Sequence, residues 1–359
     1  MENDIINYSN QNNNLFSSNP KNIEFLYDII EDSYSDHTLD NTFCTFKSIN
    51  NILYLIYSNE KISIISYDLI NNKKINELIK AHEKYITNFR YFLDKINKRD
   101  LILSISADDN NIKVWNVLNF DCLLNMKEIN KKGCLYSAYF INFNDWIYII
   151  TSNSTFKAEP IKVFDLEGNK TKIIKNNKES VYFLDVYYHY ELPKIYILIG
   201  GQGYVISYDF IKDEFYHIYR DNNNECHDSI IIFDKNEIIK LIESSKDGII
   251  RIYDSNSANL LKKIRVSNLY LVSICIWKDN YLFVGCGDKN IKLAEISEGK
   301  IIKKLNGHIN SVTTIKKILH PKYGECLISQ GYENNQIKLW AINIISFWCP
   351  ILAIIKKLK

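Results

Sequence analysis

Several features common in proteins are missing from this sequence. Its eight cysteines form no Cys-x-x-Cys motif, and none lies near a histidine at the spacing of a zinc site. No stretch reaches the roughly 18 apolar residues that a membrane-spanning helix needs. We therefore expect reduced, buried thiols in a cytoplasmic or nuclear protein, with no transmembrane segment and no metal site.

Arginine is also scarce. Only five of the 44 basic residues are arginines, and 42 acidic residues leave a formal net charge of +2. Arginine is the preferred side chain for bidentate contacts to phosphates and bases, so this composition argues against sequence-specific nucleic-acid recognition. We expect nucleic acid to be bound only indirectly or weakly.

Loops that cradle phosphate groups are missing as well. Two glycine-rich stretches, 200–205 and 285–288, lack the third glycine of a dinucleotide-binding loop and a following helix. We interpret their glycines as turn residues that supply positive φ angles. The chain has neither a Gly-x-x-x-x-Gly-Lys nor a Gly-x-Ser-x-Gly motif. We therefore expect no cofactor and no catalytic residues.

One short pattern, by contrast, occurs seven times. Each copy is an apolar run ending at a position that is usually aromatic, as in "NIKVWN" at 111–116. This position is held in turn by Tyr67, Trp115, Phe164, Tyr208, Tyr253, Ala294 and Trp340. The intervals of 48, 49, 44, 45, 41 and 46 residues are close to the length of a four-stranded propeller blade.

The period predicts an all-β fold, a seven-bladed β-propeller with four antiparallel strands in each blade. Within each copy the apolar residues alternate, and no segment has a sustained helical period. One blade cannot bury both faces of its sheet, whereas a ring of blades can. The fifth copy shows the four expected strands, at 229–233, 237–244, 249–254 and 260–266.

The repeat resembles the WD-repeat family of β-propellers over residues 22–342. A blade of that family has Gly-His before the first strand, Ser/Thr and Asp around the turn between the second and third strands, and Trp-Asp ending the third. The resemblance implies a hydrogen-bonded network of these His, Ser/Thr, Asp and Trp side chains. Its members here would be His82, Asp109 and Trp115 in the second copy, His227, Ser245, Asp247 and Tyr253 in the fifth, and His308, Asn334 (in place of the aspartate) and Trp340 in the seventh.

The second copy departs from the family pattern at Ala107, which stands where a hydroxyl group is expected. Asp109 precedes Trp115 by six residues, and the same spacing recurs in the fifth copy. This recurrence favours a structural pairing of Asp109 with His82, because buried polar groups need partners. A metal site or an acid–base pair would need more convergent groups. We expect Asp108 to face solvent.

The leading hypothesis is a non-enzymatic scaffold or adaptor that binds other proteins through its loops. The face made by the loops between blades and by the second turn of each blade is the expected binding surface, and aromatic or long side chains dominate such surfaces. For each tyrosine, packing against the adjacent blade is an equally good alternative. The candidates are Lys84, Tyr85, Asp108, Phe156, Tyr204, Tyr270 and Tyr332.

Two other functions stay open. The chain could be a subunit of an RNA-processing or ribosome-assembly complex, with lysines contacting phosphates. It could also be an enzyme or a small-ligand binder at the central channel, although the starts of the inner strands are mostly apolar and hydroxyl residues. Phosphoinositide binding is not expected, because the resemblance associates it with an Arg-Arg-Gly motif and the chain has no Arg-Arg pair.

The two ends of the chain compete to close the ring. Residues 23–30 alternate well and contain no proline, whereas residues 346–355 include Pro350, which removes a hydrogen-bond donor. We expect the N-terminal strand to close the last blade. Residues 1–21 have no basic start and no apolar run, so we expect a disordered polar segment and no secretory signal. We expect 343–359 to form an apolar and basic tail that docks with a partner.

Overall fold

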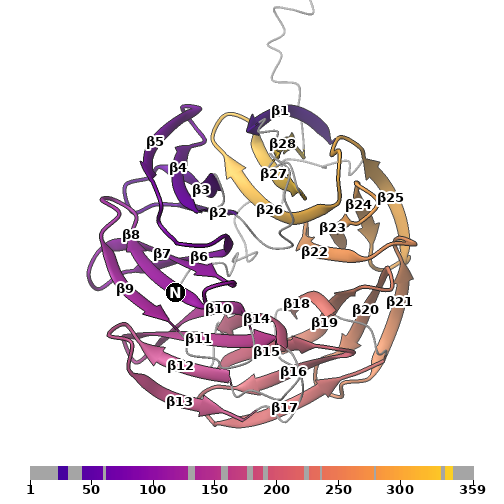
Figure 1. Ribbon diagram of the computed structural model, residues 1–359. Helices are drawn as coiled ribbons and strands as arrows, with labels where there is room; N and C mark the ends of the chain where they lie inside the picture. The colour runs from indigo at the N-terminus through magenta and orange to yellow at the C-terminus, as the bar shows by residue number, and fades with distance from the viewer. Residues whose placement is uncertain are drawn as a thin grey trace, which may run out of the picture.

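The computed structural model describes residues 23–30, 43–59, 62–127, 134–154, 161–175, 181–188, 193–221, 226–234, 237–278, 280–332 and 336–342. This part of the chain contains 28 strands and no helix. The strands form seven four-stranded antiparallel sheets around a central opening (Figure 1). The predicted all-β, seven-bladed propeller is confirmed.

In each blade the chain runs from an inner strand to an outer strand. The first three blades are β2 (Phe43–Lys47), β3 (Leu53–Asn59), β4 (Ser63–Asp68) and β5 (Lys73–Leu78); β6 (Ile86–Asp94), β7 (Arg99–Ser106), β8 (Asn111–Asn116) and β9 (Cys122–Lys127); and β10 (Cys134–Phe143), β11 (Trp146–Ser154), β12 (Ile161–Asp165) and β13 (Lys170–Ile174). Blades 4 and 5 are β14 (Val181–Tyr188), β15 (Ile195–Gly201), β16 (Tyr204–Asp209) and β17 (Glu214–Tyr219); and β18 (Cys226–Asp234), β19 (Glu237–Ser245), β20 (Ile249–Asp254) and β21 (Leu260–Arg265). Blade 6 is β22 (Leu271–Ile276), β23 (Tyr281–Cys286), β24 (Ile291–Glu295) and β25 (Lys300–Leu305).

The seventh blade joins the two ends of the described chain. Its inner three strands are β26 (Val312–His320), β27 (Gly324–Gly331) and β28 (Ile337–Ala341), and its outer strand is β1 (Glu24–Ile30). β1 pairs antiparallel with β28. The prediction that the N-terminal strand closes the ring is confirmed, and non-local hydrogen bonds therefore hold the circle together.

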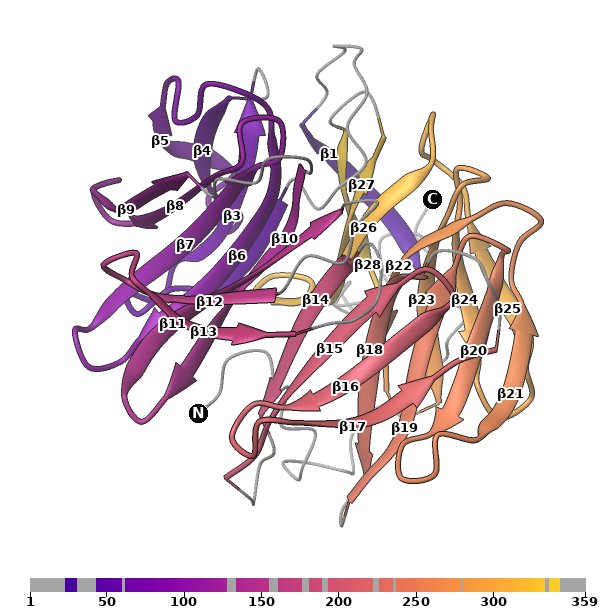
Figure 2. The same ribbon diagram turned by 60° about the horizontal axis from the view of Figure 1, so that its bottom comes forward.

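The apolar core lies between the blades. Seven clusters of buried side chains each join two neighbouring sheets, and the last joins blade 7 to blade 1 through residues such as Ile328 and Leu55. The β-branched and aromatic residues of the repeats fill these spaces because a sheet with two covered faces needs apolar residues on both. Figure 2 shows the sheets standing side by side around the ring. No blade has a complete core of its own.

The ring has two distinct faces. On the upper face the inner strands begin and the second strands end, and on the lower face the inner and third strands end.

Several predictions fall outside the described residues: the segments 1–21 and 343–359, Phe156, Asn334 and the side chain of His227. The proposed boundaries of the propeller, 22–342, stay a prediction.

Candidate functional site

A buried serine belongs to the hydrogen-bonded network of blade 2. His82 Nε2 and Ser104 Oγ are 2.7 Å apart, and Trp115 Nε1 donates to the same oxygen at 2.8 Å. All three side chains are buried. The hydroxyl group therefore comes from Ser104 on β7, and the assignment of this position to Ala107 was wrong.

Blade 7 repeats this arrangement. Ser329 Oγ lies 2.7 Å from His308 Nε2 and accepts a 2.8 Å hydrogen bond from Trp340 Nε1. In both blades the serine precedes the tryptophan by eleven residues, because it lies two residues beyond the strand-paired partner of the tryptophan. That common spacing was the signal in the sequence that could have identified Ser104.

The two imidazoles of this network stay neutral. Burial, with a contribution from Lys113, lowers the pKa of His82 to about 3, and burial with Lys338 does the same for His308. His82 Nδ1 and both carboxylate oxygens of Asp109 are buried without a hydrogen-bond partner. The structure therefore does not contain the expected hydrogen bond between His82 and Asp109. Asp108 is exposed, as expected.

Blade 5 replaces the network with an ionic cluster around Arg251. Its guanidinium donates to Asp247 (2.5 Å), Asp221 (2.8 Å) and Ser245 (3.0 Å), and lies 3.6 Å from Glu243. Burial opposes this charge, but the hydrogen bonds to Asp247 and Asp221 outweigh it and raise the pKa of Arg251. The guanidinium of Arg251 therefore has a structural role, because it holds the acidic side chains of this blade together.

The expected partners of Tyr253 in this blade were wrong in part. Ser245 donates to Asp247 at 2.5 Å, whereas the Tyr253 hydroxyl lies 3.5 Å from a carboxylate oxygen of Glu243. Glu243 occupies the position that Ser104 holds in blade 2, as the strand registers show. Glu243 at this position, together with Arg251 two residues before Tyr253, is the pattern in the sequence that could have predicted the ionic cluster.

The glycine-rich stretches serve close packing more than turn geometry. Gly203 has a positive φ of 73°, but Gly285 and Gly287 do not, so the interpretation of all these glycines as positive-φ residues was wrong. A Cβ on Gly285 would lie 2.8 Å from the carbonyl oxygen of Val312, and one on Gly287 would lie 2.9 Å from the Tyr270 ring. Neither stretch is arranged as a phosphate loop.

The predicted face residues have different environments. Lys84, Tyr85 and Asp108 are exposed, and Tyr270 and Tyr332 are half-buried on the upper face. Tyr204 is only 6% exposed. Its ring covers Gly201, where a Cβ would approach it to 2.1 Å. Tyr204 also belongs to the apolar cluster that blades 3 and 4 share, so for Tyr204 the packing alternative is correct.

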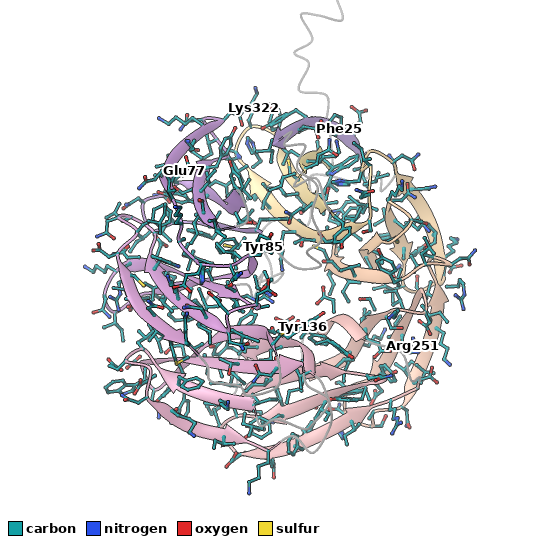
Figure 3. The ribbon with its side chains drawn as sticks, in the orientation of Figure 1. Phe25, Glu77, Tyr85, Tyr136, Arg251 and Lys322 are labelled. Carbon is teal, nitrogen blue, oxygen red and sulfur yellow. The ribbon has the colours of Figure 1, made fainter. Side chains whose placement is uncertain are left out.

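Two further tyrosines lie on the upper face and were missed. Tyr136 on β10 and Tyr182 on β14 are half-buried, and their rings meet edge to face at 5.6 Å. Figure 3 shows Tyr85 and Tyr136 at the edge of the central opening. We use the name tyrosine rim for the set Tyr85, Tyr136, Tyr182, Tyr270 and Tyr332. Tyr136 and Tyr182 follow the first buried residue of their inner strands, which is the signal that would have found them.

The inner strands also carry acidic groups that sequence reasoning missed. Burial, followed by the charge of Asp185, raises the pKa of Asp228 to about 7, and Lys316 and Arg90 oppose this shift. Asp228 accepts a 3.0 Å hydrogen bond from the backbone of Ile274 in the next blade. Serine side chains at the equivalent positions of blades 3 and 6 make the same contact between blades. Asp228 is thus part of a recurring structural link.

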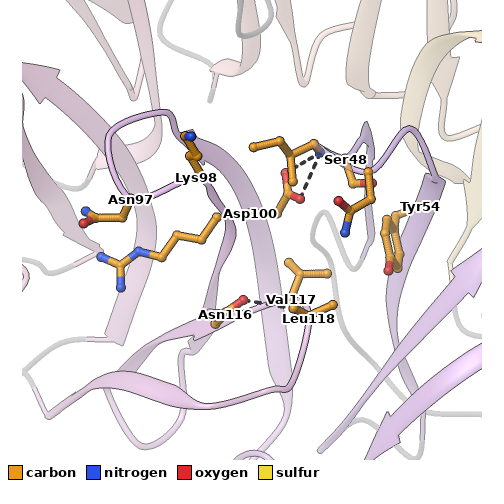
Figure 4. A pocket seen from close by; sticks show the side chains of 11 residues that line it. Ser48, Tyr54, Asn97, Lys98, Asp100, Asn116, Val117 and Leu118 are labelled. Carbon is orange, nitrogen blue, oxygen red and sulfur yellow. Dashed lines mark hydrogen bonds between the residues drawn. The ribbon is translucent and has the colours of Figure 1, made fainter.

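A polar cavity of about 310 Å³ opens between blades 1 and 2 near the lower face (Figure 4). Asp100 in its wall accepts hydrogen bonds from the backbone of Ile49 at 3.1 Å and from the Tyr91 hydroxyl at 2.7 Å. Arg99 pairs with Asp94 at 2.7 Å. The contact from Ile49 joins the two blades, and the three contacts together leave the acidic groups of this region paired.

In the described part of the chain, no three His, Cys, Asp or Glu side chains are grouped so that they could hold a metal ion. In the same part, no helix is long and apolar enough to cross a membrane.

Comparisons with known proteins give short matches. The chain is 30% identical over 104 residues to the WD repeat domain-containing protein 83 homolog of Dictyostelium discoideum, covering 29% of this chain and 31% of that protein. It is 30% identical over 74 residues to the U3 small nucleolar RNA-associated protein 21 homolog of Schizosaccharomyces pombe (21% and 8%), and 28% identical over 83 residues to myosin heavy chain kinase C of D. discoideum (23% and 10%). Each match spans less than a third of the relative. No family model matches.

Proposed function

This chain belongs to the WD-repeat β-propellers, and we propose that it is a non-enzymatic scaffold or adaptor subunit of a multiprotein complex in the cytoplasm or nucleus. Its partners are other proteins, bound on the upper face. The observation that carries this proposal is the tyrosine rim, which brings five aromatic side chains from five blades to the upper face. Figure 3 shows two of them, Tyr85 and Tyr136, at the edge of the central opening.

The rim has the properties of a binding hot spot. Tyrosine offers a large apolar ring and a polar hydroxyl group at a low cost in side-chain entropy, and it is enriched at protein interfaces. The contact between Tyr136 and Tyr182 fixes their rings before any partner arrives, which reduces the ordering cost of binding. Lys84 and Asp108 supply exposed charges of both signs beside the rim.

An enzyme at the channel is less well supported. The pair of Asp185 and Asp228 is its best candidate, because carboxyl groups with raised pKa values are common in active sites. Asp228, however, makes the same link between blades that serine makes elsewhere in the ring. The kinase relative matches this chain over 10% of its own length, which gives no basis for transferring its activity.

A role in RNA processing is the second candidate. The similarity to the U3 small nucleolar RNA-associated protein 21 homolog favours it, and lysines would supply the phosphate contacts. Several strand lysines are already committed, since Lys113 donates to the carbonyl of Ala81 at 2.7 Å and Lys292 pairs with Asp288 at 2.5 Å. Binding of RNA through a protein partner fits this chain better than direct recognition.

The test is affinity purification with mass spectrometry from the native cells. We expect the wild-type chain to recover a defined set of proteins, and the Tyr85→Ala/Tyr136→Ala variant to lose most of it. Trp146→Ala is the matched control, because Trp146 is an aromatic residue that is 64% exposed and lies at the lower face. Equal loss with the control, or no loss with the rim variant, would contradict the proposal.

A further inference from the structure

The lower face exposes large apolar side chains on four consecutive blades. The inner strands β26, β2, β6 and β10 of blades 7, 1, 2 and 3 follow one another around the central opening (Figure 1). The turn after each of these strands lies on the lower face, as does the turn between β8 and β9. We use the name apolar arc for the exposed residues at these turns: Leu319 (75% exposed), Ile49 (43%), Ile96 (62%), Trp146 (64%) and Leu118 (72%).

The charges beside the apolar arc are mainly positive. In the turns after the four inner strands, the exposed charged side chains are four lysines and one aspartate: Lys47, Lys95, Lys98, Lys322 and Asp145. Asp94 and Asp100 belong to the same region, but both are buried and accept hydrogen bonds from groups of the chain. The exposed lysines therefore determine the charge of this surface. Figure 4 shows Lys98 and Leu118 on neighbouring turns of blade 2.

The chain continues from this face with the same chemistry. β28 ends on the lower face, where the backbone N–H of Ile342 donates to the carbonyl oxygen of Glu325 at 2.9 Å. The sequence that follows, 343–359, lies outside the described residues. It is mostly apolar, contains three lysines and has no acidic residue. Further apolar and positive groups therefore start from the same side of the ring.

A membrane surface fits these features better than a protein partner does. Exposed apolar regions mark sites for proteins or for membranes. The apolar arc consists of single side chains that protrude from turns, and a rigid protein would need a matching pocket for each of them, whereas the lipid interface deforms around them. Tryptophan is enriched at the level of the lipid headgroups, and lysines near a membrane are attracted by the negative potential of anionic lipids.

We propose that the apolar arc and its lysines bind the surface of a membrane that contains anionic lipids. The lower face then lies against the lipid, and the tyrosine rim on the opposite face stays free for proteins. The two faces can be tested independently, because vesicles contain no protein partner and affinity purification in detergent contains no intact membrane. Trp146→Ala therefore remains a control for the upper face in that purification.

The test is co-sedimentation of the full chain with vesicles of phosphatidylcholine, alone or with about 30% phosphatidylserine. We expect at least about tenfold stronger binding to the anionic vesicles, and weaker binding at high salt. Ile96→Glu/Leu118→Glu should lower it at least about tenfold, because it removes two apolar anchors and adds two negative charges. Ile79→Glu/Ile309→Glu is the matched control, since these residues are 69% and 63% exposed on the upper face, and it should bind like the wild type.

A second pair of variants isolates the contribution of charge. Lys98→Glu should weaken binding to the anionic vesicles by about fivefold or more, because a lysine close to the surface is attracted by anionic lipids and a glutamate is repelled. Lys80→Glu is the matched control. Lys80 is exposed on the upper face, and its φ of 54° is close to the 50° of Lys98. Equal loss with Lys80→Glu would contradict a specific role of the lower face.

Tryptophan fluorescence tests whether the apolar arc itself meets the lipid. Trp115, Trp277 and Trp340 are 5%, 0% and 2% exposed, so in a Trp348→Phe variant Trp146 is the exposed tryptophan of the described residues. Brominated lipids in anionic vesicles should quench its emission, and neutral vesicles should do so much less. Absence of quenching would overturn the proposal.

Circular dichroism and thermal melts establish that each variant is folded. The quenching measurement leaves the apolar arc unchanged, so the proposal can fail even if a glutamate substitution disturbs the fold. A wild type that binds neither kind of vesicle would overturn it. Binding that Ile96→Glu/Leu118→Glu retains would assign the membrane contact to 343–359 and overturn it as well. Capture of an acidic protein by the lower face without vesicle binding would have the same consequence.

Discussion

Asp28 and Lys338 form an ion pair of 2.5 Å although 310 residues separate them in the sequence. They lie opposite each other in the pairing of β1 with β28. The Lys338 side chain is 5% exposed and that of Asp28 is 18% exposed, so solvent screens the pair only in part. The contact adds a charged link to the backbone pairing that closes the ring.

Lys338→Met should therefore destabilise the whole ring. It leaves Asp28 partly buried without its cation, and we expect the free energy of unfolding to fall by about 1 to 3 kcal/mol in urea melts. Lys74→Met is the control, because its pair with Glu77 lies at the surface, where such pairs contribute less than about 1 kcal/mol. An equal loss in free energy of unfolding for the two variants would show that the Asp28–Lys338 pair stabilises the ring no more than a surface ion pair does.

The Ser104 hydroxyl should be a second sensitive point. Ser104→Ala leaves His82 Nε2 and Trp115 Nε1 buried without their shared partner, and each unpaired group costs about 1 to 3 kcal/mol. Ala107→Ser is the control, since Ala107 is half-buried in a turn and a serine there should change stability by less than about 0.5 kcal/mol. If Ala107→Ser stabilised the protein and Ser104→Ala left its stability unchanged, the hydroxyl position of the network would be residue 107 and not Ser104.

The period of the repeat was sufficient to predict the fold. A propeller repeats one supersecondary unit, so seven weak signals at one spacing reinforce each other. Pro350 and the alternation of 23–30 correctly favoured β1 as the closing strand. The alternation of apolar residues and the position of proline reflect the backbone geometry of a strand, so they can be recognised in the sequence itself.

Side-chain partners were harder to predict because they depend on pairing between strands. The turn in blade 5 is one residue shorter than that in blade 2, so the position of Ser104 corresponds to Glu243, which a count back from Tyr253 does not reveal. Tyr204 and Tyr270 look alike in the sequence, yet one covers Gly201 and is buried while the other stays half-exposed. Tyr204 is also buried by apolar side chains of blade 3, and the local sequence does not report which side chains a neighbouring blade supplies.

Stability should fall as the pH is lowered below neutrality. The pKa of both His82 and His308 is about 3 in the folded ring against 6.5 for an ordinary histidine, so the unfolded chain binds more protons below pH 6.5. Each histidine should remove up to about 1.4 kcal/mol per pH unit between pH 6.5 and 3. Urea melts at pH 7.5, 6 and 5 measure the slope, to which His320 adds and to which Asp228, with its raised pKa, contributes in the opposite direction. His82→Gln should make the slope shallower, because it removes one of the histidine contributions. A slope that His82→Gln leaves unchanged would exclude this origin.

The ionic cluster of blade 5 should depend on pH in a different range. Burial opposes the charged forms of Asp221 and Asp247, but hydrogen bonds from basic groups, Arg251 among them, lower the pKa of both carboxyl groups. In the wild type this contribution to stability is present at neutral pH and is lost as the pH falls below about 4. The cluster thus stabilises the blade only while both carboxylates are ionised.

Arg251→Met should reverse that dependence. At pH 7 it leaves Glu243 buried beside Asp247 with no cation between them, and breaking a buried ionic cluster in this way costs about 3 to 5 kcal/mol. Acidification protonates the carboxylates of Glu243 and Asp247, which have lost their cation in the variant. The difference in unfolding free energy between wild type and variant should therefore narrow as the pH falls from 7 to 4. Arg265→Met is the control, since Arg265 is exposed and donates to the backbone carbonyls of Asp247 and Ser267, and it should cost less than about 1 kcal/mol at every pH. If the difference for Arg251→Met stays constant across this range, its cost comes from lost packing rather than from unpaired charge.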